Sequence, residues 1–152
     1  MDEKLIQAMK IAFASEFNFY LRTHACHWNV QGPDFKQYHD LFGTIYEEVY
    51  SSIDVFAENI RKLDAIVDVD SINERSMVNL PDMEDNTADA ATMVQMLLGD
   101  NERLVKLFAM VYKMAEDSGE YGLANFLAER QDAHQKHGWM LRSSIKGTAG
   151  RV

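Results

Sequence analysis

Four side chains in the first half of the sequence are of the types that bind transition metals: the imidazoles of His27 and His39 and the carboxylates of Asp54 and Glu58. The two carboxylates are four residues apart, so they share one face of a helix. Their apolar neighbours place that face at the edge of an apolar seam, where carboxylates must be paired, solvated or bound to a cation. Imidazole and carboxylate ligands with open positions suit a non-haem iron centre.

The positions of these residues limit how they can meet. His27 and His39 flank Gly32-Pro33, and a turn there can bring both imidazoles to one ion. Asp54 follows His39 by 15 residues on one continuous helix, which separates their backbones by about 22 Å. Either the histidines and carboxylates are unrelated, or they meet across a two-fold axis, with the histidines of one chain facing the carboxylates of the other.

Apolar spacing predicts the elements that carry these residues. Long helices are expected over about 3–25, about 35–63 with Asp34 as its cap, from the cap Thr87 to about 116, and from the break at Gly119 to about 144. A short helix is expected around 71–77 in the long middle connection. Two long helices, a crossover and two more predict a single all-α domain over residues 1–152, a ferritin-like four-helix bundle. The usual in-bundle di-iron pattern is missing, because no Glu has a His three residues later.

Composition favours a soluble protein that attracts cations. Hydrophobic residues make up 47% and charged residues 26%, and the net charge of −9 opposes binding to nucleic acid. The chain has no apolar stretch long enough to span a membrane, and its first residues lack the pattern of a signal peptide. The lone Cys26 suits a reducing cytoplasm, and we expect it to be a buried, inert thiol.

Nearly the whole chain resembles the Dps proteins, named for DNA binding in starved cells. The resemblance is carried by His27-Trp28-Asn29-Val30, Gly32-Pro33, Phe35, His39, Phe42, Asp54, Ala57-Glu58, Leu63, Asp100-Asn101-Glu102 and Trp139-Met140-Leu141-Arg142. It implies a hollow homododecamer built from two-fold dimers. It also implies that iron(II) binds between subunits at His27, His39, Asp54 and Glu58, is oxidised with hydrogen peroxide as the preferred oxidant, and is stored as a ferric core.

The chain departs from the family pattern at three places. Gly43 stands where the family usually has an acidic residue, which removes one carboxylate from the second-metal position; Asp40 and Glu47 lie near but not on that spot. His24 replaces a common lysine and is an extra candidate ligand. The acidic three-fold pore of relatives corresponds to Glu120, Asn125 and Glu129, where Asn125 replaces an expected aspartate.

Other polar and aromatic residues have simpler explanations. We expect Trp28 to serve mainly for packing, with a secondary role as a redox-active ring beside the iron, and Tyr46 and Tyr50 to be core residues. His134 and His137 are expected to be structural or surface residues, since cations suit helix C-termini.

The leading hypothesis is therefore a ferroxidase and iron-storage shell in the cytoplasm. A DNA-compacting shell is the second hypothesis, although twelve chains would carry on the order of a hundred negative charges. The tails offer only Lys4, Lys146 and Arg151 against that charge. The third hypothesis is a shell that binds metal at a site weakened by Gly43.

Overall fold

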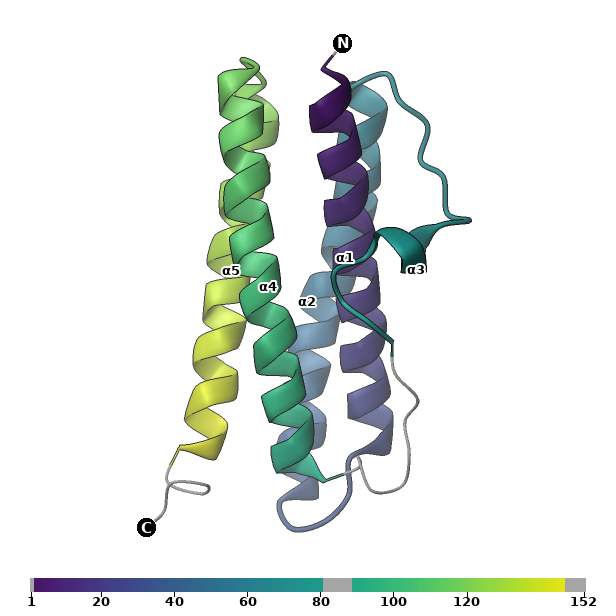
Figure 1. Cartoon of the computed structure of the whole chain (residues 1–152). Coiled ribbons are helices and arrows are strands. Elements are labelled where there is room, and N and C mark those ends of the chain that lie inside the picture. Colours follow the sequence, from purple (N-terminus) through teal and green to yellow (C-terminus); the bar gives the residue numbers. More distant parts are fainter. Residues whose placement is uncertain (1, 81–88, 147–152) are drawn as a thin grey trace.

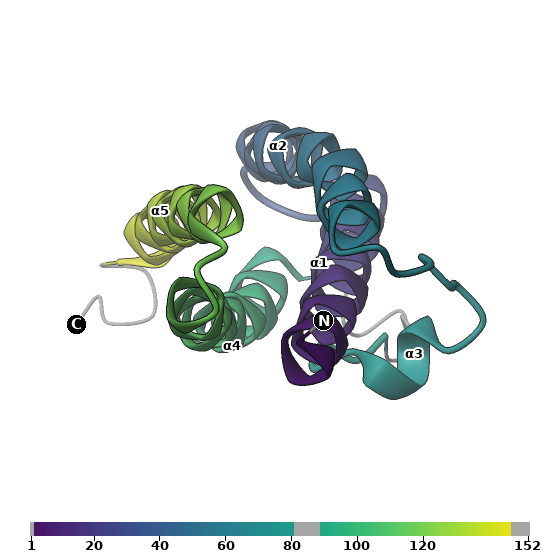
Figure 2. The same ribbon diagram turned by 90° about the horizontal axis from the view of Figure 1, so that it is seen from above.

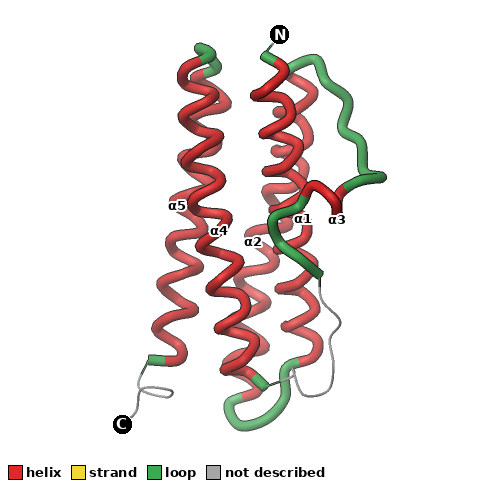
Figure 3. The backbone as a smooth tube through the Cα atoms, in the orientation of Figure 1, coloured by secondary structure: helices red, strands yellow, loops and turns green. Residues whose placement is uncertain are grey.

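The computed structural model describes residues 2–80 and 89–146, and it confirms the all-α bundle (Figure 1). Five helices follow one another along the chain: α1 (Glu3–Asn29), α2 (Phe35–Lys62), α3 (Ile72–Arg75), α4 (Ala90–Asp117) and α5 (Tyr121–Ile145). Figure 3 shows helices and loops throughout the described part, which holds no strand. The four long helices run side by side, and the short α3 lies in the connection between α2 and α4, as expected.

The bundle consists of two helical hairpins. α1 packs against α2, α4 packs against α5, and contacts between α1 and α4 join the hairpins (Figure 2). The middle connection runs along the outside of α1, where α3 rests. Large, fully buried side chains from all four long helices fill the interior, among them Phe19, Phe42, Phe108 and Leu127. In the two described ranges, no helix combines the length and the apolar character that a membrane crossing requires.

The first helix is longer than its apolar spacing predicted. α1 continues past residue 25 to Asn29, and the Val30 N–H bonds to the Cys26 carbonyl at its end. His27 therefore lies in the last helical turn and not in the loop. The difference arises because polar residues in a terminal turn can face solvent while the backbone hydrogen bonds continue.

Two expected caps differ from the structure. Asp34 precedes α2, but its φ of 64° places it in the left-handed region, and its side chain makes no capping hydrogen bond. Thr87, the cap expected for the third long helix, lies outside the described residues. Asp89 caps α4 instead, because its carboxylate accepts the Thr92 N–H.

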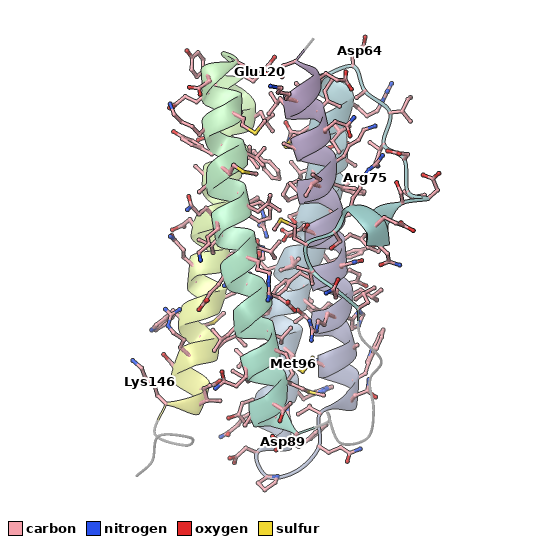
Figure 4. The ribbon with its side chains drawn as sticks, viewed as in Figure 1. Asp64, Arg75, Asp89, Met96, Glu120 and Lys146 are labelled. Atoms are coloured by element: carbon pink, nitrogen blue, oxygen red, sulfur yellow. The ribbon has the colours of Figure 1, made fainter. Side chains whose placement is uncertain are left out.

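The two hairpins run in opposite directions along the bundle. Gly119, with a φ of 77°, makes the turn from α4 to α5, as the sequence predicts. Figure 4 labels Asp89 and Glu120 at opposite ends of the bundle, where α4 and α5 begin. A parallel bridge between Gln31 and Asp89 joins the α1–α2 turn to the start of α4.

Candidate metal centre

The α1–α2 turn brings His27 and His39 together, as its position in the sequence predicts. Their rings are stacked with centroids 3.8 Å apart and planes 17° apart. Each Nδ1 lies 2.7 Å from the backbone carbonyl oxygen of the other histidine. The two side chains are thus held by a reciprocal pair of hydrogen bonds between the helix ends.

This reciprocal pair determines which ring nitrogens can bind a metal. A carbonyl oxygen only accepts, so each Nδ1 carries the proton and donates it. A metal can therefore bind these two rings only through Nε2. A hydrogen bond from one ring nitrogen to a backbone carbonyl is the usual arrangement that orients a metal-binding histidine. His27 and His39 are therefore preorganised to act as two neighbouring ligands.

Gly43 faces this histidine pair. A Cβ atom at position 43 would lie 3.2 Å from both Cε1 and Nδ1 of His27, closer than an ordinary van der Waals contact. A side chain there would meet the His27 ring. The missing side chain thus allows α2 to approach the imidazole closely.

Substitution at Gly43 should separate the effects of a carboxylate and of crowding. Gly43→Ala should gain less than the roughly 0.5–1 kcal/mol that leaving glycine gives a helix interior, because its Cβ presses on His27. Gly43→Asp adds the same crowding together with an oxygen ligand suited to iron(II). We expect it to bind more iron(II) per dimer than Gly43→Ala in anaerobic titrations. Equal binding by both variants would mean that the site needs no carboxylate at position 43.

Asp54 and Glu58 lie far along α2 from the histidines. Both are exposed in the single chain, and Asp54 lines a cavity of about 340 Å³ together with Tyr50, Ser51 and Ile53. Residues 2–80 and 89–146 of one chain contain no group of three or more His, Cys, Asp or Glu able to hold a metal. The separation that the helix length predicts is therefore present, and a shared site requires a second chain.

Large apolar side chains are exposed near both pairs of candidate ligands. Trp28 is 59% exposed and contacts the His24 ring at a centroid distance of 3.9 Å; Tyr50 is also 59% exposed. Phe35 and Val55 add to the exposed apolar area of α2. The expectation that Tyr50 is a core residue is wrong, and within one chain more than half of the Trp28 side chain is exposed. Large apolar side chains exposed beside both ligand pairs are available for contact with a second chain.

His24, the extra candidate ligand, lies beside the histidine pair. Its Nδ1 is 3.0 Å from the Tyr20 hydroxyl, and its ring stacks on the half-buried Tyr46 at 3.8 Å. Burial lowers the pKa of His24, and the nearby His27 lowers it further. Because Tyr20 engages Nδ1, only Nε2 of His24 remains for a metal. Cys26 is fully buried, and burial raises the pKa of its thiol to about 12, which confirms an inert thiol.

The candidate pore residues begin α5. Glu120, Asn125 and Glu129 are all exposed and line a groove of about 370 Å³ against the last turns of α2. The Asn125 amide donates to the Glu129 carboxylate at 3.4 Å, so the neutral side chain orients one of the two acids. Their role at a pore stays a prediction.

The bundle interior holds a polar cluster that the sequence analysis missed. We call it the core cluster; its members are Glu16, Glu48, Ser52, Asn101, Arg130, His134 and His137. It explains His134 and His137, which are buried well before the end of α5, so the helix C-terminus does not account for them. Glu16 could have been noticed, because it follows Phe13 by three residues and precedes Tyr20 by four, on the apolar stripe of α1.

Glu16 is the centre of the core cluster. One carboxylate oxygen accepts from Ser52 at 2.7 Å and from Arg130 at 3.0 and 2.7 Å, and the other lies 2.7 Å from His134 Nε2. Burial raises the pKa of Glu16, but the charges of His134 and Arg130 and these hydrogen bonds lower it more, so the net pKa lies below its ordinary value. Glu16 is therefore a buried carboxylate.

His134 is held on both sides. Its Nδ1 lies 2.8 Å from Asn101 Oδ1, whose amide orientation follows from the bond that Asn101 Nδ2 donates to the His134 carbonyl. Since an amide oxygen only accepts, the His134 Nδ1 donates to Asn101. Burial lowers the pKa of His134 more than the charge and hydrogen bond of Glu16 raise it, so the net pKa lies below its ordinary value.

Glu48 connects α2 to the same cluster and predicts an acid-sensitive fold. Partial burial raises its pKa, yet hydrogen bonds from His137 and Arg130 outweigh this and leave the pKa at about 2, against an ordinary 4.5. A carboxylate with a lowered pKa stabilises the fold above pH 4.5 and loses that contribution as the pH falls toward 2. Urea unfolding across this window should show a smaller loss of stability in Glu48→Gln than in the parent. Glu47→Gln, at the exposed neighbouring position, should behave like the parent.

Comparison with known proteins agrees with the all-α, ferritin-like fold. The model of the ferritin-like domain family matches residues 6–149. General stress protein 20U of Bacillus subtilis is 27% identical over 145 residues, which cover 95% of this chain and 99% of that protein. The DNA protection during starvation protein of Brevibacillus brevis is 28% identical over 84% of this chain and 85% of its own length. The X-ray structure of Dps from Thermosynechococcus elongatus superposes with a TM-score of 0.89 at 24% identity, over 94% of this chain and 90% of that one.

Proposed function

The chain belongs to the Dps family of ferritin-like proteins, and from this premise we propose that it oxidises iron(II) between paired subunits and stores the product in a hollow shell. The observation that carries the proposal is the reciprocal hydrogen bonding of His27 and His39, which leaves both Nε2 atoms free to bind. Iron is the substrate of this reaction. Family membership supports iron storage and protection in general, and the intersubunit site is the finer proposal.

In the proposed site, each two-fold dimer forms two centres. His27 and His39 of one chain supply nitrogen ligands, and Asp54 and Glu58 of the other supply oxygen ligands. The carboxylates neutralise the charge of bound iron(II), and the neutral imidazoles leave coordination positions open for the oxidant. Two iron(II) ions each give one electron to hydrogen peroxide, which takes up two protons and becomes two molecules of water.

Iron(II) oxidation tests the proposal directly. Anaerobic protein loaded with iron(II) should develop ferric absorbance on adding hydrogen peroxide or oxygen, faster than the same iron in buffer, and the ferric product should remain with the protein on gel filtration. Oxidation at the buffer rate with both oxidants would contradict the proposal.

Assembly is the second expectation. The apolar side chains exposed at Trp28, Phe35, Tyr50 and Val55 favour burial against a second chain, and a two-fold contact there brings each histidine pair toward the opposite carboxylates. Sedimentation at micromolar concentration should show a large particle built from dimers, for which we propose twelve subunits. A stable monomer would contradict the intersubunit site.

DNA compaction is less well supported than iron oxidation, although a relative is named for DNA protection. The net charge of −9 opposes DNA. We expect no gel shift of duplex DNA in low salt. A shift that disappears as salt is added would instead favour an electrostatic DNA-binding role.

A further inference from the structure

A single guanidinium lies where several potential metal ligands of the core cluster converge. Arg130 Nη2 bonds to Glu16 at 2.7 Å, and Nη1 bonds to Glu48 at 2.6 Å. The same Nη2 lies 3.3 Å from His134 Nε2. One side chain of α5 thus contacts a carboxylate of α1, a carboxylate of α2 and an imidazole of its own helix.

Burial explains why a cation must be present at this point. The side chain of Glu16 is 0% exposed and that of Arg130 is 6% exposed. A fully buried carboxylate such as Glu16 is strongly unfavourable unless a positive charge lies beside it, and the partly exposed Glu48 adds a second negative charge nearby. Arg130 provides that charge permanently, because a guanidinium does not lose its proton in proteins.

In the native chain these residues bond to one another and to Arg130, and they form no metal site. Once the guanidinium is removed, we expect their oxygen and nitrogen atoms to become available to a divalent transition metal. Carboxylates from two helices and two histidines on a third are the donor types of metal sites inside helical bundles, although the Glu-x-x-His spacing of those sites is absent here. Two carboxylates and two imidazoles suit zinc, cobalt(II) and iron(II). His137 adds a further sign: its Nε2 bonds to Glu48 at 2.7 Å, while its buried Nδ1 has no hydrogen-bond partner among the described residues.

We propose that Arg130 is a built-in cation that fills a latent divalent-metal site between α1, α2 and α5. Removing its guanidinium turns Glu16, Glu48, His134 and His137 into metal ligands. Arg130 thereby keeps iron out of the bundle interior and leaves it to the protein surface. The proposal concerns groups within one chain, so it does not depend on the intersubunit site. Glu48 is 38% exposed, which gives an ion a route from solvent to the cluster.

The test uses cobalt(II) and zinc with the assembled protein. The background variant His39→Ala/Asp54→Ala removes ligands of the proposed intersubunit site, so that failure there and failure here are distinguishable. Adding Arg130→Ala to this background should create one visible-absorbing cobalt site per chain, bound more than about tenfold tighter than in the background alone. Zinc should displace the cobalt and raise the unfolding midpoint.

Two control variants isolate the proposed ligands and the charge. Arg130→Lys keeps a cation in the cluster and should gain no cobalt site. Glu16→Gln combined with Arg130→Ala removes one carboxylate and should lose the gained site.

Two results would overturn the proposal: Arg130→Ala binds no more metal than the background, or Glu16→Gln leaves the gained binding intact. Should Arg130→Ala unfold in the presence of a chelator, zinc or cobalt is expected to refold it. A protein that stays unfolded with either metal would also overturn the proposal.

Discussion

Iron(II) oxidation is expected to fall to the rate of iron in buffer both in His39→Ala and in Asp54→Ala. The two residues lie on the same helix, about 22 Å apart along its axis, so neither substitution touches the other residue within a chain. Each removes one of the few ligands of the proposed shared site. His39→Ala also breaks the hydrogen bond that His39 Nδ1 donates to the His27 carbonyl, which weakens the orientation of the histidine pair.

Mixed dimers distinguish a shared site from two independent ones. A dimer with one His39→Ala chain and one Asp54→Ala chain places both substitutions in one of its two centres and leaves the other centre complete. Separately purified variants, dissociated and reassembled together, should therefore recover part of the activity that neither has alone. Reassembled parent protein is the control for losses during the procedure. No recovery in the mixture would show that His39 and Asp54 do not share a site.

The largest loss of stability is expected from Glu16→Ala. Removing one partner of a buried, hydrogen-bonded ion pair leaves an uncompensated charge, which costs about 3–5 kcal/mol. Arg130 would still bond to Glu48, but His134 Nε2 and Ser52 would lose their bonds to Glu16. Chemical unfolding of the parent and the variant at neutral pH measures the difference.

An exposed ion pair provides the matched control for Glu16. Lys113 pairs with Asp117 at 2.9 Å on the surface of α4, where both side chains are more than half exposed. Lys113→Ala should change the free energy of unfolding by less than about 1 kcal/mol, because solvent screens such pairs. Similar losses in Glu16→Ala and Lys113→Ala would show that the core cluster is not a dominant source of stability.

The core cluster and the surface ligand pairs depend on the fold in different ways. The core cluster joins α5 to α1 and α2 through Arg130, and its hydrogen bonds require a particular alignment of three helices. The histidine pair and the carboxylate pair lie at the surface. Their residues come only from α1 and α2. Substitutions in the core cluster should therefore act mainly on stability, and substitutions in the surface pairs mainly on iron.

Local sequence pattern determined the elements and the limits on the site. Apolar side chains at spacings of three and four specify four long helices, because that spacing lines one helical face. Gly32-Pro33 specifies the turn that brings His27 to His39. The rise per residue of a helix shows that His39 and Asp54 cannot meet within one chain. Each of these properties depends on residues close together in the sequence.

The tertiary structure decided which side chains from different helices meet. Periodicity tells which face of α1 carries Glu16, but not that Arg130, 114 positions later, lies opposite it. Gly43 appears in the sequence as a lost carboxylate, whereas packing shows that it admits the His27 ring. A helical pattern specifies a face and leaves its partner open, because the partner depends on how distant helices align. The core cluster arises from that alignment, since only the folded bundle surrounds the Glu16 carboxylate with Ser52, Arg130 and His134.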